Sequence, residues 1–215
     1  SLRDWSSDVC SSDLAAAWIL AQGLSAERPL VILSDNSVEH ALFALAAQHV
    51  GVPSAAISPA YSLMSRDFDK LKSMITLLGP GAIYVSGTKP FAAALAAIQP
   101  LHSAIIVSGN ADDSEAISFR SIAATPETPD VEKAFAAITP DTIAKFLFTS
   151  GSTGTPKAVI NTQRMLTSSQ QAKAQTWTFL ADGGDLVILD WLPWSHTFGA
   201  NHNFILVLRN GGTLY

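Results

Sequence analysis

The sequence predicts an α/β fold in which mostly parallel sheets are flanked by helices. Short apolar runs alternate along the chain with longer segments of helical periodicity, which is the order that successive βαβ units produce. Parallel strands need a crossover between them, and helices on both faces of the sheet supply it. With 48% hydrophobic residues among its 215, the chain can bury a sizeable core.

The first half of the chain contains four predicted strands separated by helices. Residues 30–33 are a short, purely apolar run, which is typical of a buried strand. Asn36, with Glu39 three residues later, predicts a capping box that starts a helix, and Gly51 ends it. The expected apolar face of this helix is Ala41, Leu42, Leu45, Ala46 and His49. The other expected elements are strands at about 52–57, 83–85 and 104–107, and helices at about 66–78 and 89–98.

The second half begins with a polar segment, 109–130, which we interpret as a surface excursion with one short strand at 117–119. A helix at about 131–138 leads into an apolar strand, 143–148, and residues 159–160 form a return strand. A long helix at about 163–180 and a strand at 186–190 follow. No internal repeat is present in the sequence.

The N-terminus is expected to be foreign to the fold. Residues 4–13 match the translation of a sequencing adapter, and apolar periodicity starts abruptly at Ala15. We therefore treat residues 1–14 as a non-native leader and 15–215 as the domain; a genuine polar leader is the alternative. Without Arg3 and the three aspartates of the leader, the net charge moves from −5 to −3. The single cysteine, Cys10, leaves with it, which excludes disulfide, thiol and cysteine–metal chemistry.

Composition excludes several other classes of protein. The chain is mildly acidic without a basic cluster, so a nucleic-acid surface is not expected. No apolar run reaches the roughly 18–20 residues of a membrane span, and no basic start precedes an apolar core as in a signal peptide. We expect a soluble, cytoplasmic protein with small-molecule partners and no membrane partner. The oligomeric state is left open.

The most informative segment is the loop TSGSTGTPK at 149–157, directly after the predicted strand 143–148. Glycine lets a backbone approach a ligand closely, while hydroxyls, free N–H groups and a lysine surround an anion. The pattern therefore predicts a polyphosphate site; a solvated linker is the alternative. The candidate phosphate-binding residues are Thr149, Ser150, Gly151, Ser152, Thr153, Gly154, Thr155 and Lys157.

The order of residues in this loop separates two classes of phosphate-binding protein. A Walker A loop requires Gly-Lys-Ser/Thr, but Pro156 precedes Lys157 and Ala158 follows it. The string TSGSTGTPK instead resembles the phosphate-binding motif of the adenylate-forming (AMP-binding) superfamily, which includes acyl-CoA synthetases, luciferases and peptide-synthetase adenylation domains.

A second motif strengthens the resemblance. Pro193, His196 and Gly199 match the Pro-x-x-His-x-x-Gly motif that in this superfamily follows the phosphate loop by some forty residues. The resemblance implies that His196 is a catalytic residue that contacts the acyl carboxylate, and that Trp194 and Phe198 line the substrate pocket. An imidazole can donate to developing negative charge, and a carboxylate that is already ionised needs no general base. A purely structural histidine is the alternative.

The remaining histidines show no such pattern. His202 is expected in a helix, in a capping or surface role. His40, His49 and His102 are spread along the chain without evident partners and without metal-ligand spacing. We therefore expect no metal site in the chain, and any magnesium would arrive with ATP phosphates.

Two further segments, ISPAYSL at 57–63 and DWLPW at 190–194, resemble feruloyl-CoA synthetases over a match spanning roughly 15–215. The resemblance implies an acid–thiol ligase that uses ATP and coenzyme A: an acid and ATP give an acyl-adenylate and pyrophosphate, then acyl-CoA and AMP. Aromatic side chains such as Tyr61 are compatible with a hydroxycinnamate substrate, although they also pack cores. A fatty acyl-CoA ligase is another possibility within the superfamily.

The resemblance also implies that the chain is an N-terminal fragment. Family members need an adenine-binding segment, a ribose-binding aspartate and a C-terminal lid with a lysine, and none of these is found within the 215 residues. We expect the fragment to be inactive alone. The rival classes are a phosphate-loop binding protein without adenylation chemistry, and a non-catalytic fragment that associates through an exposed sheet edge.

Overall fold

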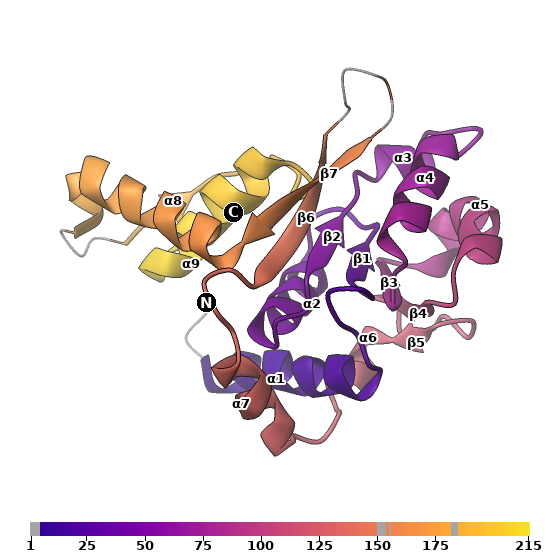
Figure 1. Cartoon of the computed structure of the whole chain (residues 1–215), viewed down its shortest axis with the longest axis horizontal. Helices are drawn as coiled ribbons and strands as arrows, with labels where there is room; N and C mark the ends of the chain where they lie inside the picture. Colours follow the sequence, from indigo (N-terminus) through magenta and orange to yellow (C-terminus); the bar gives the residue numbers. More distant parts are fainter. Residues whose placement is uncertain (1–4, 150–153, 155, 182–184) are drawn as a thin grey trace.

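A computed structural model describes residues 5–149, 154, 156–181 and 185–215 (Figure 1). Within these residues, seven strands form the main sheet in the order β5-β4-β3-β1-β2-β6-β7. Their bounds are β1 Leu30–Ile32, β2 Ser54–Ala56, β3 Ala82–Val85, β4 Ile105–Ser108, β5 Ile117–Ser118, β6 Ile143–Thr149 and β7 Lys157–Thr162.

All pairings in this sheet are parallel except that of β7, which runs antiparallel to β6. The sheet grows outward in two directions from the β1–β3 pair: β4 and β5 follow on one side, and β2 and β6 on the other. Along the chain, β1 is followed by β2 on one side and β3 by β4 on the other, so this pair is a topological switch point. Open α/β sheets bind ligands at such points, at the carboxyl ends of their strands. The predicted fold class is therefore confirmed.

Helices cover both faces of the sheet, as Figure 1 shows. One face packs against α1 (Trp5–Ala21), α2 (Val38–His49), α6 (Phe119–Ile122) and α7 (Pro129–Ala136). The other packs against α3 (Ala60–Leu63), α4 (Asp69–Leu78) and α5 (Thr88–Ile98), which a short 3₁₀ turn, Gln99–Leu101, extends. The side chains of β1 alternate between the two cores: Leu30 and Ile32 enter the first, and Val31 enters the second. Both faces of this strand are buried, which is why its sequence is uniformly apolar.

The chain after β7 forms a smaller unit beside the sheet. It contains α8 (Gln163–Thr176), a 3₁₀ turn (Thr178–Ala181), a π-helix (Phe198–Phe204) and α9 (Ile205–Asn210). Two short strands, β8 (Val187–Ile188) and β9 (Thr213–Leu214), pair in parallel as a separate sheet. The expected helix at 163–180 ends earlier, at Thr176, and the expected strand at 186–190 is shorter.

The start of α2 differs from the prediction. Ser37, not Asn36, is the N-cap, and its Oγ accepts a hydrogen bond from the His40 amide at 3.1 Å. The buried face is also different, comprising His40, Phe43, Ala46 and Ala47, because α2 packs between the sheet and α1. Among the five residues expected on the apolar face, Ala46 is the one that is fully buried.

Two other predictions at the surface are refined. Segment 109–130 lies largely at the surface and contains the expected short strand, β5, but Phe119 and Ile122 anchor it in the core. Helix α1 crosses the boundary at residue 14, and the Asp13 carboxylate lies 3.7 Å from the ring of His49. The non-native origin of residues 1–14 stays a prediction. In the described part of the chain, no helix is long and apolar enough to span a membrane.

An aromatic cluster lies at the centre of the first core. The fully buried Phe43 ring lies 5.9 Å from Trp18, 6.0 Å from Tyr84 and 5.4 Å from Phe119, so it joins α1, α2, β3 and α6. Tilted and edge-to-face contacts of this kind add to the hydrophobic gain of burial.

We predict that Phe43→Ala lowers the free energy of unfolding by about 3–5 kcal/mol, because it removes these contacts and leaves a cavity. Urea titration followed by circular dichroism measures the change. Val38→Ala in the same helix is the matched control: Val38 is 70% exposed, and its loss should change stability by no more than about 0.5 kcal/mol. Equal effects of the two substitutions would contradict the assignment of the core.

Candidate functional site

The first part of the candidate site is the hairpin between β6 and β7. As predicted, the two strands run antiparallel and are joined by the phosphate-loop motif, with Thr149 paired opposite Lys157 at its mouth. Both residues are exposed. Gly154 has a φ of 81°, and a Cβ built there would meet no atom of the described residues within 4 Å. The other candidate loop residues, Ser150, Gly151, Ser152, Thr153 and Thr155, lie outside the described residues.

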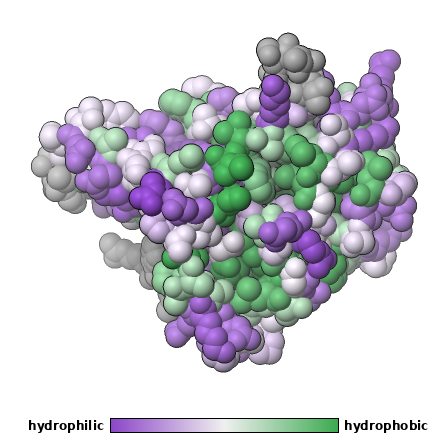
Figure 2. Space-filling model, in the orientation of Figure 1, coloured by the Kyte–Doolittle hydropathy of each residue, from purple (hydrophilic) through white to green (hydrophobic). Residues whose placement is uncertain are grey.

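The described part of this hairpin is compatible with a polyphosphate ligand. The positive φ at Gly154 is a conformation that glycine adopts without strain. Lys157 is exposed, and none of the ion pairs among the described residues involves it. Figure 2 shows apolar side chains gathered over the middle of the face below the hairpin, with hydrophilic ones around its rim.

The second part of the site is the loop 191–197, which we call the His196 loop. His196 is exposed, its amide donates to the Pro193 carbonyl at 3.0 Å, and its Nδ1 accepts from the Phe198 amide at 3.3 Å. An imidazole that accepts at Nδ1 carries its proton on Nε2 when neutral. Nε2–H is thus left as a donor toward a ligand, which is the chemistry expected of a residue that contacts a carboxylate.

Gly199 explains why the motif needs its glycine. A Cβ at this position would lie 2.6 Å from the Pro193 carbonyl oxygen and 2.8 Å from that of Leu192. The same Pro193 carbonyl accepts from His196. Proline, histidine and glycine are therefore three parts of a single tight turn.

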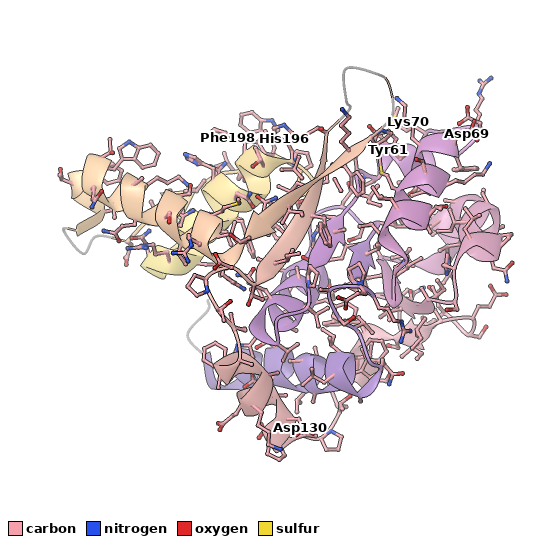
Figure 3. All side chains as sticks on the ribbon, viewed as in Figure 1. Tyr61, Asp69, Lys70, Asp130, His196 and Phe198 are labelled. Atoms are coloured by element: carbon pink, nitrogen blue, oxygen red, sulfur yellow. The ribbon has the colours of Figure 1, made fainter. Side chains whose placement is uncertain are left out.

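Phe198 and His202 form a stacked pair on the π-helix. Their ring centroids are 4.6 Å apart with an interplanar angle of 5°, and Phe198 is 49% exposed. Figure 3 shows His196 and Phe198 close together at the surface beside the β6–β7 hairpin. His202, expected in a capping or surface role, instead stacks on Phe198 and lies 5.6 Å from Trp177.

A polar network holds the π-helix against the hairpin. The Asn201 amide donates to the Asn161 side chain of β7 at 2.8 Å, and Gln170 of α8 donates to the Asn201 carbonyl at 2.8 Å. Asn161 and Gln170 are buried, where such hydrogen bonds are costly to lose. The two motifs of the site are therefore supported by the same strand, β7.

Trp194 faces inward. Its ring packs edge-on against His40 at 5.2 Å and lies 4.5 Å from Phe204, and its buried Nε1 has no hydrogen-bond partner among the described residues. Tyr61 likewise packs against the second core, under the ammonium of Lys70. The contacts of both residues fit the alternative, a packing role; a role of Trp194 in the substrate pocket stays a prediction.

Beside Trp194 is a cavity of about 20 Å³, lined by His40, Ser54, Lys145 and Phe204 among others. That volume is about that of one water molecule and excludes an acyl group. Burial lowers the pKa of His40 to about 4, which is the net value after the opposing effect of the Asp35 carbonyl and a smaller lowering by the nearby Lys145. Burial also lowers the pKa of Lys145 to about 8. At neutral pH, His40 is uncharged.

The prediction that three histidines lack partners was wrong. His40 contacts Asp35 and Trp194, His49 stacks on Phe135 at 4.7 Å, and the His102 ring accepts from the Ala104 amide at 3.0 Å. Nothing in the sequence around His40 indicates Trp194, because the two are brought together only by the fold. Among the described residues, no cluster of histidine, cysteine and carboxylate side chains could hold a metal ion.

Together, fold and site define an α/β protein in which a hairpin with a glycine-rich loop lies beside the exposed imidazole of His196. Residues 10–215 match the model of the AMP-binding enzyme family. The chain therefore belongs to the AMP-binding enzymes.

Two curated relatives align over most of the chain. The 4-coumarate–CoA ligase of Humulus lupulus is 27% identical over 95% of the chain and 36% of its own length. The "3-[(3aS,4S,7aS)-7a-methyl-1,5-dioxo-octahydro-1H-inden-4-yl]propanoyl:CoA ligase" of Mycobacterium tuberculosis is 25% identical over 93% of the chain and 39% of its own length. The chain thus spans less than two fifths of either relative.

Solved structures show the same fold. The chain superposes with a TM-score of 0.78 on a putative long-chain-fatty-acid CoA ligase from Rhodopseudomonas palustris, at 18% identity, over 96% of this chain and 49% of that one. The ATP-bound MatB of Rhodopseudomonas palustris gives a TM-score of 0.73 at 24% identity, over 96% and 38%.

We predict that the stability of the fold depends on the protonation of His40. Its pKa is about 4 in the folded state and 6.5 in the unfolded state, so between these values the unfolded chain binds the extra proton. This contribution to the free energy of unfolding is fully present above pH 6.5 and is lost as the pH falls. The loss amounts to about 3 kcal/mol at pH 4.

Urea titrations at pH 7 and pH 4 measure this loss. His40→Gln should lose about 3 kcal/mol less stability than the wild type over that range. A parallel decline of the two proteins would contradict the burial of a neutral His40.

Proposed function

We propose that this chain is the N-terminal part of an ATP-dependent acid–thiol ligase, which converts a carboxylic acid, ATP and coenzyme A into acyl-CoA, AMP and pyrophosphate. The observation that carries the proposal is that one strand, β7, is connected to both motifs. β7 begins at Lys157 at the mouth of the phosphate loop and holds, through Asn161, the π-helix that follows His196. Membership of the AMP-binding family supports the same reaction class.

In this proposal the hairpin loop, Thr149–Lys157, binds the β- and γ-phosphates of ATP. The exposed Thr149 and Lys157 and the open Gly154 supply a hydroxyl, a cation and an accessible backbone at the mouth of the loop. The work of the loop is positioning and charge neutralisation of the leaving pyrophosphate, and each charged hydrogen bond contributes about 1.5–3 kcal/mol. Magnesium would be carried by the phosphates.

His196 is proposed to act on the carboxylate of the acid. Its Nε2–H points away from the turn that Nδ1 closes, so the ring presents a donor to the carboxylate oxygen and to the charge that develops there. Since the acid is ionised at neutral pH, no proton needs to be abstracted.

For the acid itself we propose an aromatic compound of the hydroxycinnamate (feruloyl) class. The half-exposed Phe198, held flat against His202 next to His196, offers a ring surface on which a second ring could stack at low entropic cost. A relative named as a 4-coumarate–CoA ligase supports this choice. A relative named for a bicyclic propanoyl acid and a neighbour named for long-chain fatty acids make an aliphatic acid the competing possibility.

We predict that the 215-residue chain alone releases no pyrophosphate with any acid, and that a chimera does. The chimera replaces the matching N-terminal part of the Humulus lupulus ligase with this chain, and a coupled pyrophosphate assay reports turnover. Ferulate should be used at least tenfold better than octanoate, and His196→Ala should lower the rate in the chimera by about 10²–10³-fold. Turnover by the isolated chain would contradict the fragment proposal, and preference for octanoate would contradict the aromatic acid.

A second prediction concerns the phosphate loop in the isolated chain. If the loop binds phosphates while the adenine pocket lies outside this chain, ATP and tripolyphosphate should bind with affinities within about threefold of each other. Lys157→Ala should weaken both about tenfold, the loss of one charged hydrogen bond. Isothermal titration calorimetry measures these affinities.

Lys133→Ala is the control, because Lys133 is exposed and pairs with Asp130 on α7. ATP binding far tighter than that of tripolyphosphate would favour the rival class, a free-standing nucleotide-binding protein. Equal effects of the two lysine substitutions would show that Lys157 does not bind the phosphates.

A further inference from the structure

The side chain of Asn36 joins two distant parts of the chain. Its Nδ2–H donates to the Leu192 carbonyl at 2.9 Å, and its Oδ1 accepts from the Trp194 amide at 2.9 Å. Asn36 follows β1, whereas both partners lie in the His196 loop, more than 150 residues later. We call this pair of hydrogen bonds the Asn36 clamp.

The clamp is possible because Ser37 caps α2. With Ser37 Oγ bonded to the His40 amide, the Asn36 side chain is free of the capping role that the sequence suggested. One turn along α2, His40 packs edge-on against the Trp194 ring at 5.2 Å. Asn36, just before α2, therefore holds the backbone of Trp194, and His40 in the first turn of α2 packs against its indole.

The clamp also lies at the carboxyl-end edge of the sheet, next to the switch point. Asn36 belongs to the loop after β1, and β1 and β3 form the switch point of the sheet. Loops at the carboxyl ends of such strands form the ligand-binding edge of α/β folds. Asn36 thus attaches the His196 loop to the rigid part of that edge.

Leu192 and Trp194 flank Pro193, the residue that organises the turn. Clamping both neighbours fixes the direction of the Pro193 carbonyl, which accepts from the His196 amide and lies against Gly199. The orientation of the His196 ring follows from this turn, since its Nδ1 is held by the Phe198 amide. Asn36 is two hydrogen bonds of this network away from His196, since its own bonds go to Leu192 and Trp194.

A primary amide donates and accepts from two adjacent atoms of one planar, uncharged group. Aspartate at this position could accept from Trp194 but would face the Leu192 carbonyl with a second acceptor. Alanine could do neither. The residue type is therefore matched to its two partners.

We propose that Asn36 is a positioning residue, which orients the His196 loop for the reaction by clamping Leu192 and Trp194. The role in turnover rests on the proposed ligase function, whereas the clamp itself is a property of this chain and is tested separately.

The first experiment measures hydrogen exchange of backbone amides by ¹H–¹⁵N NMR in the 215-residue chain. Asn36→Ala should speed exchange of the Trp194 amide at least tenfold while the amides of β1 and β3 exchange as before. Asn36→Asp should keep Trp194 protected within about threefold of the wild type, because a carboxylate oxygen still accepts from it. The His196 ¹⁵N resonances should shift in Asn36→Ala, since the Phe198 contact to Nδ1 loosens.

Asn110→Ala is the matched control, because the hydrogen bonds of the Asn110 side chain among the described residues go to Asp112 and Asp113 in its own turn. It should leave Trp194 and His196 unchanged. Unchanged Trp194 exchange in Asn36→Ala would overturn the clamp, and faster exchange throughout the sheet would show a general structural role and overturn the positioning role.

The second experiment measures turnover of the chimera described above. Asn36→Ala should lower kcat about tenfold or more with the KM for ATP unchanged, and Asn36→Asp should recover part of it. An unchanged kcat beside faster Trp194 exchange would overturn the positioning role. A chimera that is inactive with every acid would count against the proposed function, while the exchange measurements would still decide on the clamp.

Discussion

The parallel pairing of β6 with β2 is the interaction on which both halves of the molecule depend. Ser54 and Ala55 pair with Lys145 and Phe146, and this short ladder joins the helix-covered sheet to the hairpin that carries the phosphate loop. Because β7 pairs only with β6 in this sheet, its place follows from the same ladder. The π-helix is then held to β7 through Asn161, so this strand pairing contributes to the position of both site motifs, while the Asn36 clamp gives the His196 loop a second attachment.

Much of this arrangement can be predicted from the sequence, for a physical reason. The strands around 30–33 and 83–85 are buried on both faces, and Val107 in the run 104–107 is buried as well, so these short runs are apolar throughout and stand out between polar segments. The hairpin was accessible too, because a glycine-rich loop separated two apolar runs. The start of α2 was assigned to the wrong residue since Asn36 and Ser37 are equally good capping residues, and only the distant partners of Asn36 distinguish them.

The site was predicted as a set of residues but not as a geometry. Motif spacing identified His196 and Gly199, and the structure supplies the reason for the glycine, a carbonyl that leaves no room for a Cβ. The inward packing of Trp194 against His40 could not be foreseen, because a tryptophan in a loop serves equally well in a core or a pocket wall. Contacts between residues far apart in the chain, such as His40 with Lys145, have no local pattern in the sequence.

The π-helix has a consequence for how this kind of site could diversify. A π-helical turn corresponds to one residue inserted into an α-helix, and here it holds the rings of Phe198 and His202 in parallel. Removing one residue from 198–204 would restore an α-helical turn and rotate the preceding side chains by about 100° around the axis. A single-codon deletion would then replace the aromatic surface presented beside His196 while β7, α8 and the phosphate hairpin kept their places. Under the proposed function, such a deletion would offer a short evolutionary route from one acid to another.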